Sequence, residues 1–415
     1  MTTAGVVTIV DFNGSAARLA AAFNARGLTC IRVQSNPEAK APSAQAEQLV
    51  TDRVIHHGDF DATLKAVAAH EPVIVIAGGE SGVELADQLS EALGLRTNGT
   101  ALSYARRTKD AQIATVRAAG LPTARQLSVT SADELADWHR RLGGRVVVKP
   151  TRSARNDGVS FCDTPEAAVA AYERIRRSVN VYGLRNEGVV AQEYLSGTEY
   201  IVNTVSCGGT HRLTDMWEYS KITVNGIPDR INGMTSVPAG ASVFEELRTY
   251  AFGVLDALAI GNGPVHLELM LTADGPRIVE AGARMCGEDV AQFAALATGE
   301  SQVDRTVQAY LEPERFLADA GQPYRLGHHA AMVFMASPVE GTLRSYPLLP
   351  LVHELRSYRD SAFKVNPGDI LRRTVDDSSE PLWVGLSHPD RATLLQDFMT
   401  VIYLDGFGFY DLEPA

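Results

Sequence analysis

The chain has 415 residues, which predicts two or three packed units, because a single hydrophobic core rarely extends over that length. Hydrophobic residues make up 45% and charged residues 21%, a balance typical of globular proteins and not of disordered ones. The net charge of -12 disfavours a nucleic-acid partner, since such proteins carry basic surfaces that neutralise phosphates.

Neither export nor membrane insertion is indicated. No apolar run approaches the roughly 20 residues that cross a bilayer, and the first residues lack the basic start of a secretory signal. The four cysteines, Cys30, Cys162, Cys207 and Cys286, show no C-x-x-C spacing for zinc or redox chemistry. We therefore expect reduced thiols, a cytoplasmic location and no membrane partner.

The first hundred residues alternate strand and helix patterns. Short apolar, β-branched runs at 6–12, 28–33 and 72–77 predict strands, and the helical runs lie between and after them. This alternation favours a parallel sheet with right-handed crossovers. The turns at Asn13-Gly14 and Gly78-Gly79 lie where such sheets bind ligands, but neither is a G-x-G-x-x-G motif and a helix cap explains each equally well.

The rest of the chain mixes helices with β-rich stretches. Residues 103–142 have a helical pattern that Gly120 and Pro122 interrupt. A helical stretch after Ser301 precedes a mainly β tail from about Gly327. Between these parts the patterns predict strands at 144–150, 158–162, 189–197, 198–209 and 264–284, with helices at 166–179 and 244–260.

The run HLELM followed by TADGP and RIVEA predicts a β-hairpin with acidic residues on one face. Because strand side chains alternate, His266 and Glu268 share a face, and the Asp-Gly turn signals a hairpin. If the turn is centred on Asp274, Glu268 and Glu280 stand directly opposite each other, with Cβ atoms roughly 4.5–5.5 Å apart. Two carboxylates this close favour a magnesium ion bound together with nucleotide phosphates. A solvated sheet face with a lysine nearby is equally compatible with the spacing.

Two further clusters suit phosphate binding. Arg284 follows the second strand, where its guanidinium can contact phosphate oxygens. The valine-rich strand RVVVKP carries Lys149 to its end, and a loop of small and polar residues follows from Arg152 to Gly158. Backbone N–H groups of such a loop can bind a polyphosphate, although an ordinary hairpin loop has the same composition.

Taken in order, these motifs resemble those of the ATP-grasp superfamily, and in particular its carboxylate–amine ligases. The order is ARRTKDAQIATVRAAGLPTAR, VVVKP, the small-residue loop, QEYLSGTEY, VHLELM and VEAGAR. The resemblance covers essentially the whole chain. It implies an α/β and α+β multidomain ATP-grasp fold, with a parallel α/β pre-ATP-grasp domain at 1–105, a small lid subdomain at 106–195, and a large subdomain with a β-rich C-terminal extension at 196–415.

The resemblance also implies the binding residues. Glu268 and Glu280 would bind magnesium, with manganese as the alternative metal, while Arg284, His266 and Lys221 would serve catalysis. For His266, a role as a mere hydrogen-bonded neighbour stays equally open. The implied ATP contacts are Lys109, Lys149, Lys221, Ser153 and Gly158 at the phosphates, Glu193, Tyr194 and Leu195 at the adenine, and Glu199 at the ribose.

One residue departs from the family pattern. The family usually has asparagine two residues after the second metal glutamate, and this chain has Gly282 there, which leaves open how a second metal ion would bind. The segments WEYSKI and EAGARMCG are similar to enzymes that join L-amino acids into dipeptides.

The expected function is therefore ATP-dependent amide formation. A carboxylate, most simply an amino acid, would be activated as an acyl phosphate and coupled to an amine, with release of ADP and phosphate. The alternatives are an ATP-grasp carboxylase that uses carboxyphosphate and a nucleotide-binding regulator without catalysis. The expected partners are ATP and the two small substrates, and a homodimer is one assembly compatible with the sequence.

Overall fold

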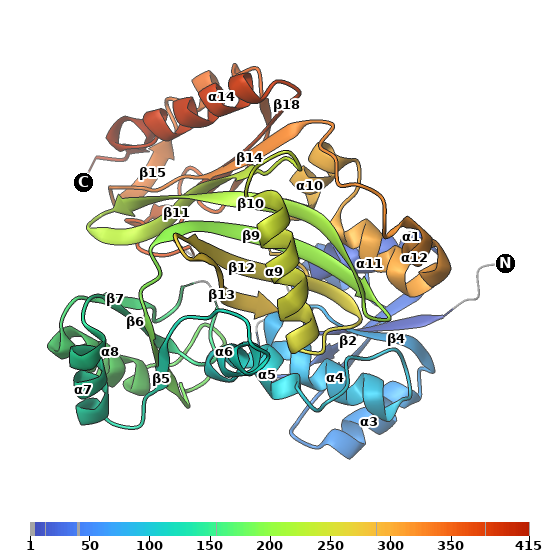
Figure 1. The fold of residues 1–415 in the computed structure, drawn as a ribbon. Coiled ribbons are helices and arrows are strands. Elements are labelled where there is room, and N and C mark those ends of the chain that lie inside the picture. The colour runs from blue at the N-terminus through green and yellow to red at the C-terminus, as the bar shows by residue number, and fades with distance from the viewer. Residues whose placement is uncertain are drawn as a thin grey trace.

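The computed structural model of the chain describes residues 5–12, 14–39, 42–154, 156–287, 289–377 and 379–414. Three packed units follow one another along the sequence, each built on its own sheet, with further C-terminal elements on the third (Figure 1). Asn13, one of the two candidate turn residues, lies outside the described residues.

The N-terminal unit contains the expected parallel sheet, with strand order β3-β2-β1-β4. β1 pairs in parallel with both β2 and β4, which confirms the interpretation of the alternating pattern. A further strand and helix, at 52–55 and 60–68, were not predicted, because the strand is short and largely exposed. The elements are β1 Val6–Val10, α1 Ala16–Ala25, β2 Thr29–Gln34, α2 Ala44–Glu47, β3 Asp52–Ile55, α3 Phe60–Ala68, β4 Pro72–Ala77, η1 Glu80–Gly82 and α4 Val83–Ala92.

The second unit is a small antiparallel sheet, β5-β8-β6-β7, covered by two antiparallel helices. Both helices have side-chain caps, since Ser131 accepts from the Glu134 N–H and Thr164 accepts from the Ala167 N–H. The elements, with the two helices that lead into this unit, are α5 Ser103–Arg107, α6 Lys109–Ala118, β5 Gln126–Ser128, α7 Ala132–Leu142, β6 Val146–Pro150, β7 Ser160–Cys162, α8 Pro165–Arg177 and β8 Val189–Glu193.

The third unit is an eight-stranded antiparallel sheet in the order β13-β12-β9-β10-β11-β14-β18-β16. Helix α9 crosses one face of this sheet, and the small unit and the N-terminal unit lie below it (Figure 1). Its first strands and helices are β9 Gly197–Cys207, β10 Thr210–Val224, β11 Ile227–Ser236, α9 Phe244–Ala257, β12 Gly263–Thr272, β13 Gly275–Gly282, α10 Val290–Thr298, α11 Gln302–Leu311 and α12 Pro313–Asp319.

The C-terminal portion is partly β, as expected, and three of its strands join the large sheet. It also contains a 14-residue helix, α14, that packs on this sheet. Its elements are β14 His329–Phe334, β15 Gly341–Ser345, α13 Leu349–His353, β16 Tyr358–Phe363, β17 Ile370–Leu371, β18 Leu382–His388, α14 Arg391–Leu404, η2 Phe407–Phe409 and β19 Asp411–Leu412. The domain limits at 105/106 and 195/196 stay a prediction.

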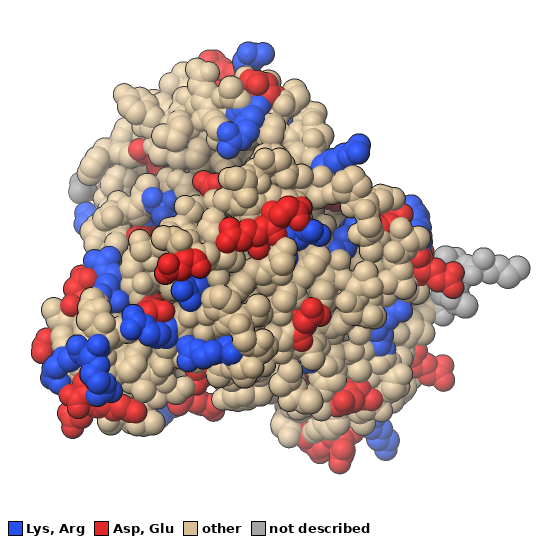
Figure 2. Space-filling model, viewed as in Figure 1, with Lys and Arg blue, Asp and Glu red and all other residues tan. Residues whose placement is uncertain are grey.

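The surface and the thiols agree with the composition. Basic and acidic side chains are interspersed on the face seen in Figure 2. The four cysteines are buried and free, as expected. No helix in the described ranges is both long and apolar enough to span a membrane.

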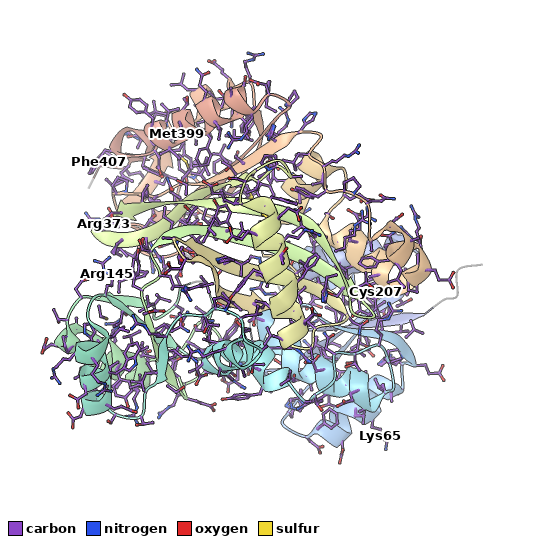
Figure 3. The ribbon with its side chains drawn as sticks, viewed as in Figure 1. Lys65, Arg145, Cys207, Arg373, Met399 and Phe407 are labelled. Atoms are coloured by element: carbon purple, nitrogen blue, oxygen red, sulfur yellow. The ribbon has the colours of Figure 1, made fainter. Side chains whose placement is uncertain are left out.

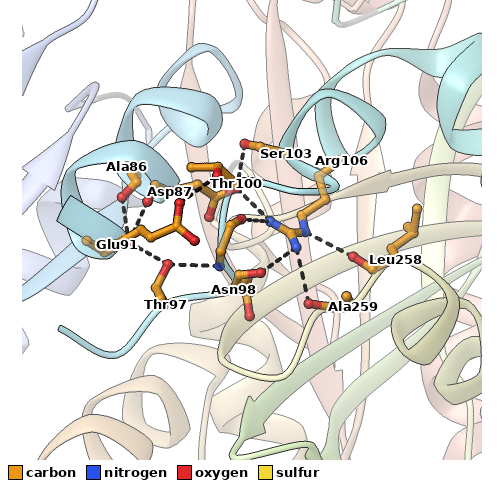
Figure 4. Close-up of polar contacts among 12 residues, drawn as sticks. Ala86, Asp87, Glu91, Thr97, Asn98, Thr100, Ser103, Arg106, Leu258 and Ala259 are labelled. Carbon is orange, nitrogen blue, oxygen red and sulfur yellow. Dashed lines mark hydrogen bonds and ion pairs between the residues drawn. The ribbon is translucent and has the colours of Figure 1, made fainter. Parts of the chain in front are cut away.

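A buried arginine joins the N-terminal unit to the large one (Figure 4). Arg106 is 1% exposed, and its guanidinium donates to Asp87 Oδ2 at 2.8 Å. It also donates to four backbone oxygens, those of Asn98, Gly99, Leu258 and Ala259. Because buried charges are tolerated only when paired and hydrogen-bonded, this network fixes the two units against each other.

Replacing Arg106 by leucine should therefore destabilise the protein by about 3–5 kcal/mol, since it leaves the Asp87 carboxylate buried without its cation. Chemical denaturation followed by circular dichroism measures the loss. Arg140→Leu is the matched control, because Arg140 is exposed and pairs only with the exposed Asp137, and it should change stability by less than about 0.5 kcal/mol. Equal stability of Arg106→Leu and Arg140→Leu would contradict the proposed role of the network.

Candidate active site

The acidic hairpin has the predicted carboxylate pair. β12 and β13 are antiparallel neighbours, and Glu268 stands directly opposite Glu280. The apolar residues of β12, Val265, Leu267 and Leu269, are fully buried on the other face. The alternation of HLELM therefore placed Glu268 correctly on the face opposite these apolar residues.

The turn, however, differs from the expectation that it is centred on Asp274. Thr272 pairs with Gly275, so Ala273 and Asp274 form a two-residue loop. The register then shifts by one residue between Glu268 and Leu269, a β-bulge that restores the Glu268–Glu280 pair. The predicted pair is correct, and the predicted turn centre is wrong by half a residue.

Both carboxylates are ionised at neutral pH. Burial by itself would raise the pKa of Glu268, but the hydrogen bond and charge of His266, with Arg284 and Lys109 beyond it, lower that pKa to about 2. Burial likewise opposes ionisation of Glu280, and the charge of Lys109 outweighs it and lowers the pKa. The site thus presents two stable negative charges.

A row of side chains across three strands orients Glu268. His266 Nε2 lies 3.5 Å from Glu268 Oε1, and His266 Nδ1 lies 2.9 Å from Asn203 Oδ1. Asn203 in turn donates to the buried carboxylate of Asp215. Burial would lower the pKa of His266, but the Cys286 sulfur and the Glu268 carboxylate raise it to about 10. Both ring nitrogens of His266 are engaged, which favours positioning of Glu268 over a direct role with substrate.

Two lysines face the acidic pair from the small unit. Lys109, the first residue of α6, donates from Nζ to Glu280 Oε1 at 2.6 Å and to the Ser153 carbonyl at 3.0 Å. Lys149 is the penultimate residue of β6 and is 6% exposed, and within the described part of the chain its Nζ makes no hydrogen bond. Burial first and the neighbouring Lys109 second lower the pKa of Lys149 to about 8. A buried, unpaired cation of this kind suits an anionic ligand.

If Lys149 binds the nucleotide, its lowered pKa predicts that nucleotide binding is sensitive to alkaline pH. As the pH rises through about 8, Lys149 loses its proton, and the KM for ATP should rise because the cation is lost. Initial rates at saturating second substrates between pH 7 and pH 9 measure this. The variant Lys149→Met should bind ATP weakly at every pH, without the rise. A rise of the same size in Lys149→Met would assign the effect to another group.

The remaining expected ATP contacts lie around the same space. Lys221 on β10 pairs with the buried Glu199 on β9, which raises the pKa of Lys221 although burial opposes it. Glu193, at the end of β8, accepts from the backbone N–H and the side chain of Arg125. The hinge residues follow, with the Tyr194 hydroxyl donating to Asp229 at 3.0 Å and Leu195 half-buried.

The Tyr194 ring also contacts Arg145. Its guanidinium lies 5.4 Å from the ring centroid, on the part of the small unit that faces the large sheet (Figure 3). This contact fixes the orientation of the hinge residue.

The small-residue loop connects β6 to β7. Ser153 is 3% exposed, and its hydroxyl donates to Asp157 at 2.6 Å. Gly158 has φ +74°, and a Cβ there would approach Pro150 Cγ to 2.9 Å, so only glycine fits. Arg155 lies outside the described residues. The loop therefore lies over the end of β6, next to Lys149.

Arg284 is held by a residue that the sequence did not reveal. Its Nε donates to Glu80 Oε2 at 3.0 Å, and Glu80 lies in η1, directly after strand β4 of the N-terminal unit. Arg107 approaches the other Glu80 oxygen at 3.8 Å. A Cβ on Gly282 would lie 2.7 Å from Glu80 Oε2. The glycine that replaces the family's asparagine is thus the residue that admits Glu80.

One feature of the sequence could have identified Glu80 as a candidate site residue. It follows Gly78-Gly79, at the carboxyl end of a parallel strand, where ligands of such sheets bind. Arg107 and Tyr182 carried no comparable signal, because only the packing of three units brings them to this place.

The carboxylate pair fits a divalent metal ion. Glu268 and Glu280 are hard oxygen donors that are each about a quarter exposed, 25% and 24%. In the described residues no cluster of three or more His, Cys, Asp or Glu ligands exists. Two carboxylates without further protein ligands match an ion that completes its shell with phosphate oxygens and water.

Comparisons with known proteins agree with this geometry. A family model described as an ATP-grasp domain matches residues 143–292. Dapdiamide A synthase from Enterobacter agglomerans is 32% identical over 421 aligned residues, which cover 98% of this chain and 97% of that protein.

Two solved structures share the fold. An L-amino acid ligase from Bacillus licheniformis has a TM-score of 0.79 at 18% identity, over 99% of both chains. An N5-carboxyaminoimidazole synthetase from Staphylococcus aureus, complexed with ADP, has a TM-score of 0.66 at 13% identity, over 97% of this chain and 98% of that one. At these identities, the structural likeness concerns the fold alone.

Proposed function

Because the chain belongs to the ATP-grasp family and is an ATP-dependent ligase that forms C–N bonds, we propose that it joins an amino acid to an amine through an acyl phosphate. The observation that carries this proposal is the ionised Glu268–Glu280 pair with Lys109, Lys149 and Arg284 around it.

In the first step the substrate carboxylate oxygen forms a bond to the γ-phosphorus of ATP, and the bond from that phosphorus to the ADP oxygen breaks. Little covalent chemistry is required of the protein, so positioning and charge neutralisation carry the rate. We assign Lys109 and Lys149 to the phosphates, because they approach from the side of the small unit. Lys221 and Glu199 lie across the same space.

In the second step the amine nitrogen attacks the acyl carbon, inorganic phosphate leaves, and the nitrogen loses a proton. Arg284 is our candidate for stabilising the developing oxyanion, since its guanidinium is fixed beside the carboxylate pair by Glu80. His266 orients Glu268 in this scheme and is not needed as a base.

We propose magnesium as the metal, held by Glu268 and Glu280. Such an ion would neutralise charge on the phosphate oxygens as the phosphoryl group is transferred. Manganese is the alternative, and rates after chelation and readdition of each metal separate the two.

An amino acid suits the site because Glu80 places a negative charge beside Arg284. A carboxylate that is 6% exposed and flanked by two guanidinium groups can accept hydrogen bonds from a substrate ammonium group. The guanidinium groups would meanwhile face the substrate carboxylate. Simple carboxylic acids without an amino group would leave Glu80 without this partner.

The test is a screen of amino-acid pairs with ATP, scored for ADP, phosphate and a new amide by mass. We expect ADP and amide in equal amounts with at least one pair. ATP hydrolysis that depends on bicarbonate and not on an amine would instead favour a carboxylase. Nucleotide binding without any turnover would favour the regulator, and AMP with pyrophosphate would contradict acyl phosphate chemistry.

Two further properties stay proposals. The four free thiols suit a reducing compartment, and we propose the cytoplasm on that ground. A homodimer is proposed for the assembly, and light scattering after gel filtration measures it.

A further inference from the structure

The connection between α8 and β8 carries a tyrosine into the candidate active site. Tyr182 comes from the small unit, yet its carbonyl accepts from the Asn36 side chain of the N-terminal unit at 3.3 Å. The guanidinium of Arg107 lies 5.4 Å from the centroid of its ring. Tyr182 therefore lies between two units, at the side where Glu80 meets Arg284.

The surroundings of the Tyr182 hydroxyl are those of the proposed acid site. Burial raises the pKa of Tyr182 to about 12, and the charges that act on the hydroxyl are those of Glu80, Arg107, Arg284 and Glu280. Among the residues that the structure describes, this hydroxyl has no hydrogen-bond partner. The ring contacts Arg107, which also approaches Glu80, the carboxylate that holds Arg284.

The loop that carries Tyr182 is fixed to the small-residue loop over the phosphate site. Asn180 is 7% exposed and donates to the Arg152 carbonyl at 3.0 Å, while its Oδ1 accepts from the Tyr182 and Leu184 N–H groups. The Val181 N–H donates to Asp157, which also accepts from Ser153. Tyr182 is thus held at a defined position relative to the nucleotide loop.

We propose that Tyr182 determines which acids the enzyme accepts, with its ring as the wall against which the acid's side chain packs. This inference rests on the proposed function. The substrate's charged end would lie at Glu80 and Arg284, so its side chain must extend beside the ring that covers Arg107. In this proposal the ring favours compact aliphatic side chains over aromatic ones, because a bulky group already lies beside Arg107.

The experiment compares wild type with Tyr182→Ala and Tyr182→Phe, using glycine, alanine, valine, leucine and phenylalanine as acids at saturating ATP and amine. Differences of one or a few methylene groups in an apolar pocket change kcat/KM by roughly 10–200-fold. We expect Tyr182→Ala to raise kcat/KM for phenylalanine by about 10-fold or more and to raise the KM for the small acids. Tyr182→Phe should retain the wild-type order of preference.

Two controls keep the outcomes distinct. Tyr403→Ala removes a tyrosine that is 87% exposed on α14 and should leave the preference unchanged. An equal fall of kcat/KM for all five acids in Tyr182→Ala, with the order unchanged, would overturn the proposal. Should Tyr182→Ala fail to fold, Tyr182→Leu replaces it, with the same expected shift in order. Absence of amide from every acid with wild type would instead overturn the proposed function itself.

Discussion

Replacing Glu280 by glutamine should lower the rate of ADP release by a factor on the order of 10³–10⁴, which corresponds to about 4–5.5 kcal/mol of transition-state stabilisation. Glutamine keeps the shape of the side chain but removes the charge. The metal ion would lose one of two ligands, and Lys109 would lose the carboxylate that it contacts at 2.6 Å. The loss concerns the chemical step, where charge on the phosphoryl group has to be neutralised.

The fold should survive this substitution, because the amide oxygen can still accept from Lys109 and β13 keeps its backbone pairing. ADP release in a coupled assay measures the rate, and circular dichroism with thermal unfolding measures the fold. Glu340→Gln is the control, since Glu340 is exposed and lies outside the site. Activity of Glu280→Gln within about 10-fold of wild type, about 1.4 kcal/mol, would remove the metal assignment.

The acidic pair was predictable because it depends on local rules. Alternation along β12 fixes which residues share a face, and the turn signal brings the partner strand back beside it. The β-bulge between Glu268 and Leu269 was not predictable, since an extra residue in one strand leaves no mark in the hydrophobic pattern. The prediction of the pair survived because the bulge and the shorter turn compensate each other.

Local sequence rules could not identify the site residues that other units contribute. Glu80 and Tyr182 lie about 100 residues apart in the chain, and Arg284 lies another 100 beyond. Arg284 nevertheless contacts Glu80, and Arg107 lies beside both Glu80 and the Tyr182 ring. Their meeting depends on how three sheets pack, which periodicity does not encode. The resemblance to a family supplied the order of the units, and the unusual Gly282 and the place of Glu80 after Gly78-Gly79 were the sequence features connected with the Glu80 contact.

The strands of the large sheet also include some that the sequence predicts and some that it does not. Strands β9, β12 and β13 follow from alternation and apolar content. The long hairpin β10–β11 was not predicted, because polar and partly exposed residues interrupt the apolar content of both strands. Helix α14 was not predicted, because it lies in a tail that is otherwise rich in strands. Its amphipathic pattern is also weak, since apolar side chains lie on different sides of the helix, with Phe398 buried and Met399 exposed.

Replacing Arg284 by alanine should lower kcat for amide formation by about 10²–10³-fold, while the KM for ATP changes by less than about 3-fold. Arg284 donates to Glu80 and to the Met285 carbonyl, so it is fixed before substrate binds. Fixed donors stabilise developing charge without reorganisation, which affects the transition state more than ground-state binding. Arg284→Lys should recover only part of the rate, because a lysine lacks the planar fork.

Loss of activity in Arg284→Ala has a second explanation, since Glu80 would be left buried beside the more distant Arg107 alone. An unpaired buried carboxylate destabilises a protein by itself. The double variant Arg284→Ala/Glu80→Gln separates the two effects. If Arg284 acts on the reaction, the double variant unfolds at a higher temperature than Arg284→Ala but keeps the same low kcat at saturating amino acid, where weaker binding of the ammonium group at Glu80 does not limit the rate. Recovery of turnover together with stability would show instead that Arg284 serves only to neutralise Glu80.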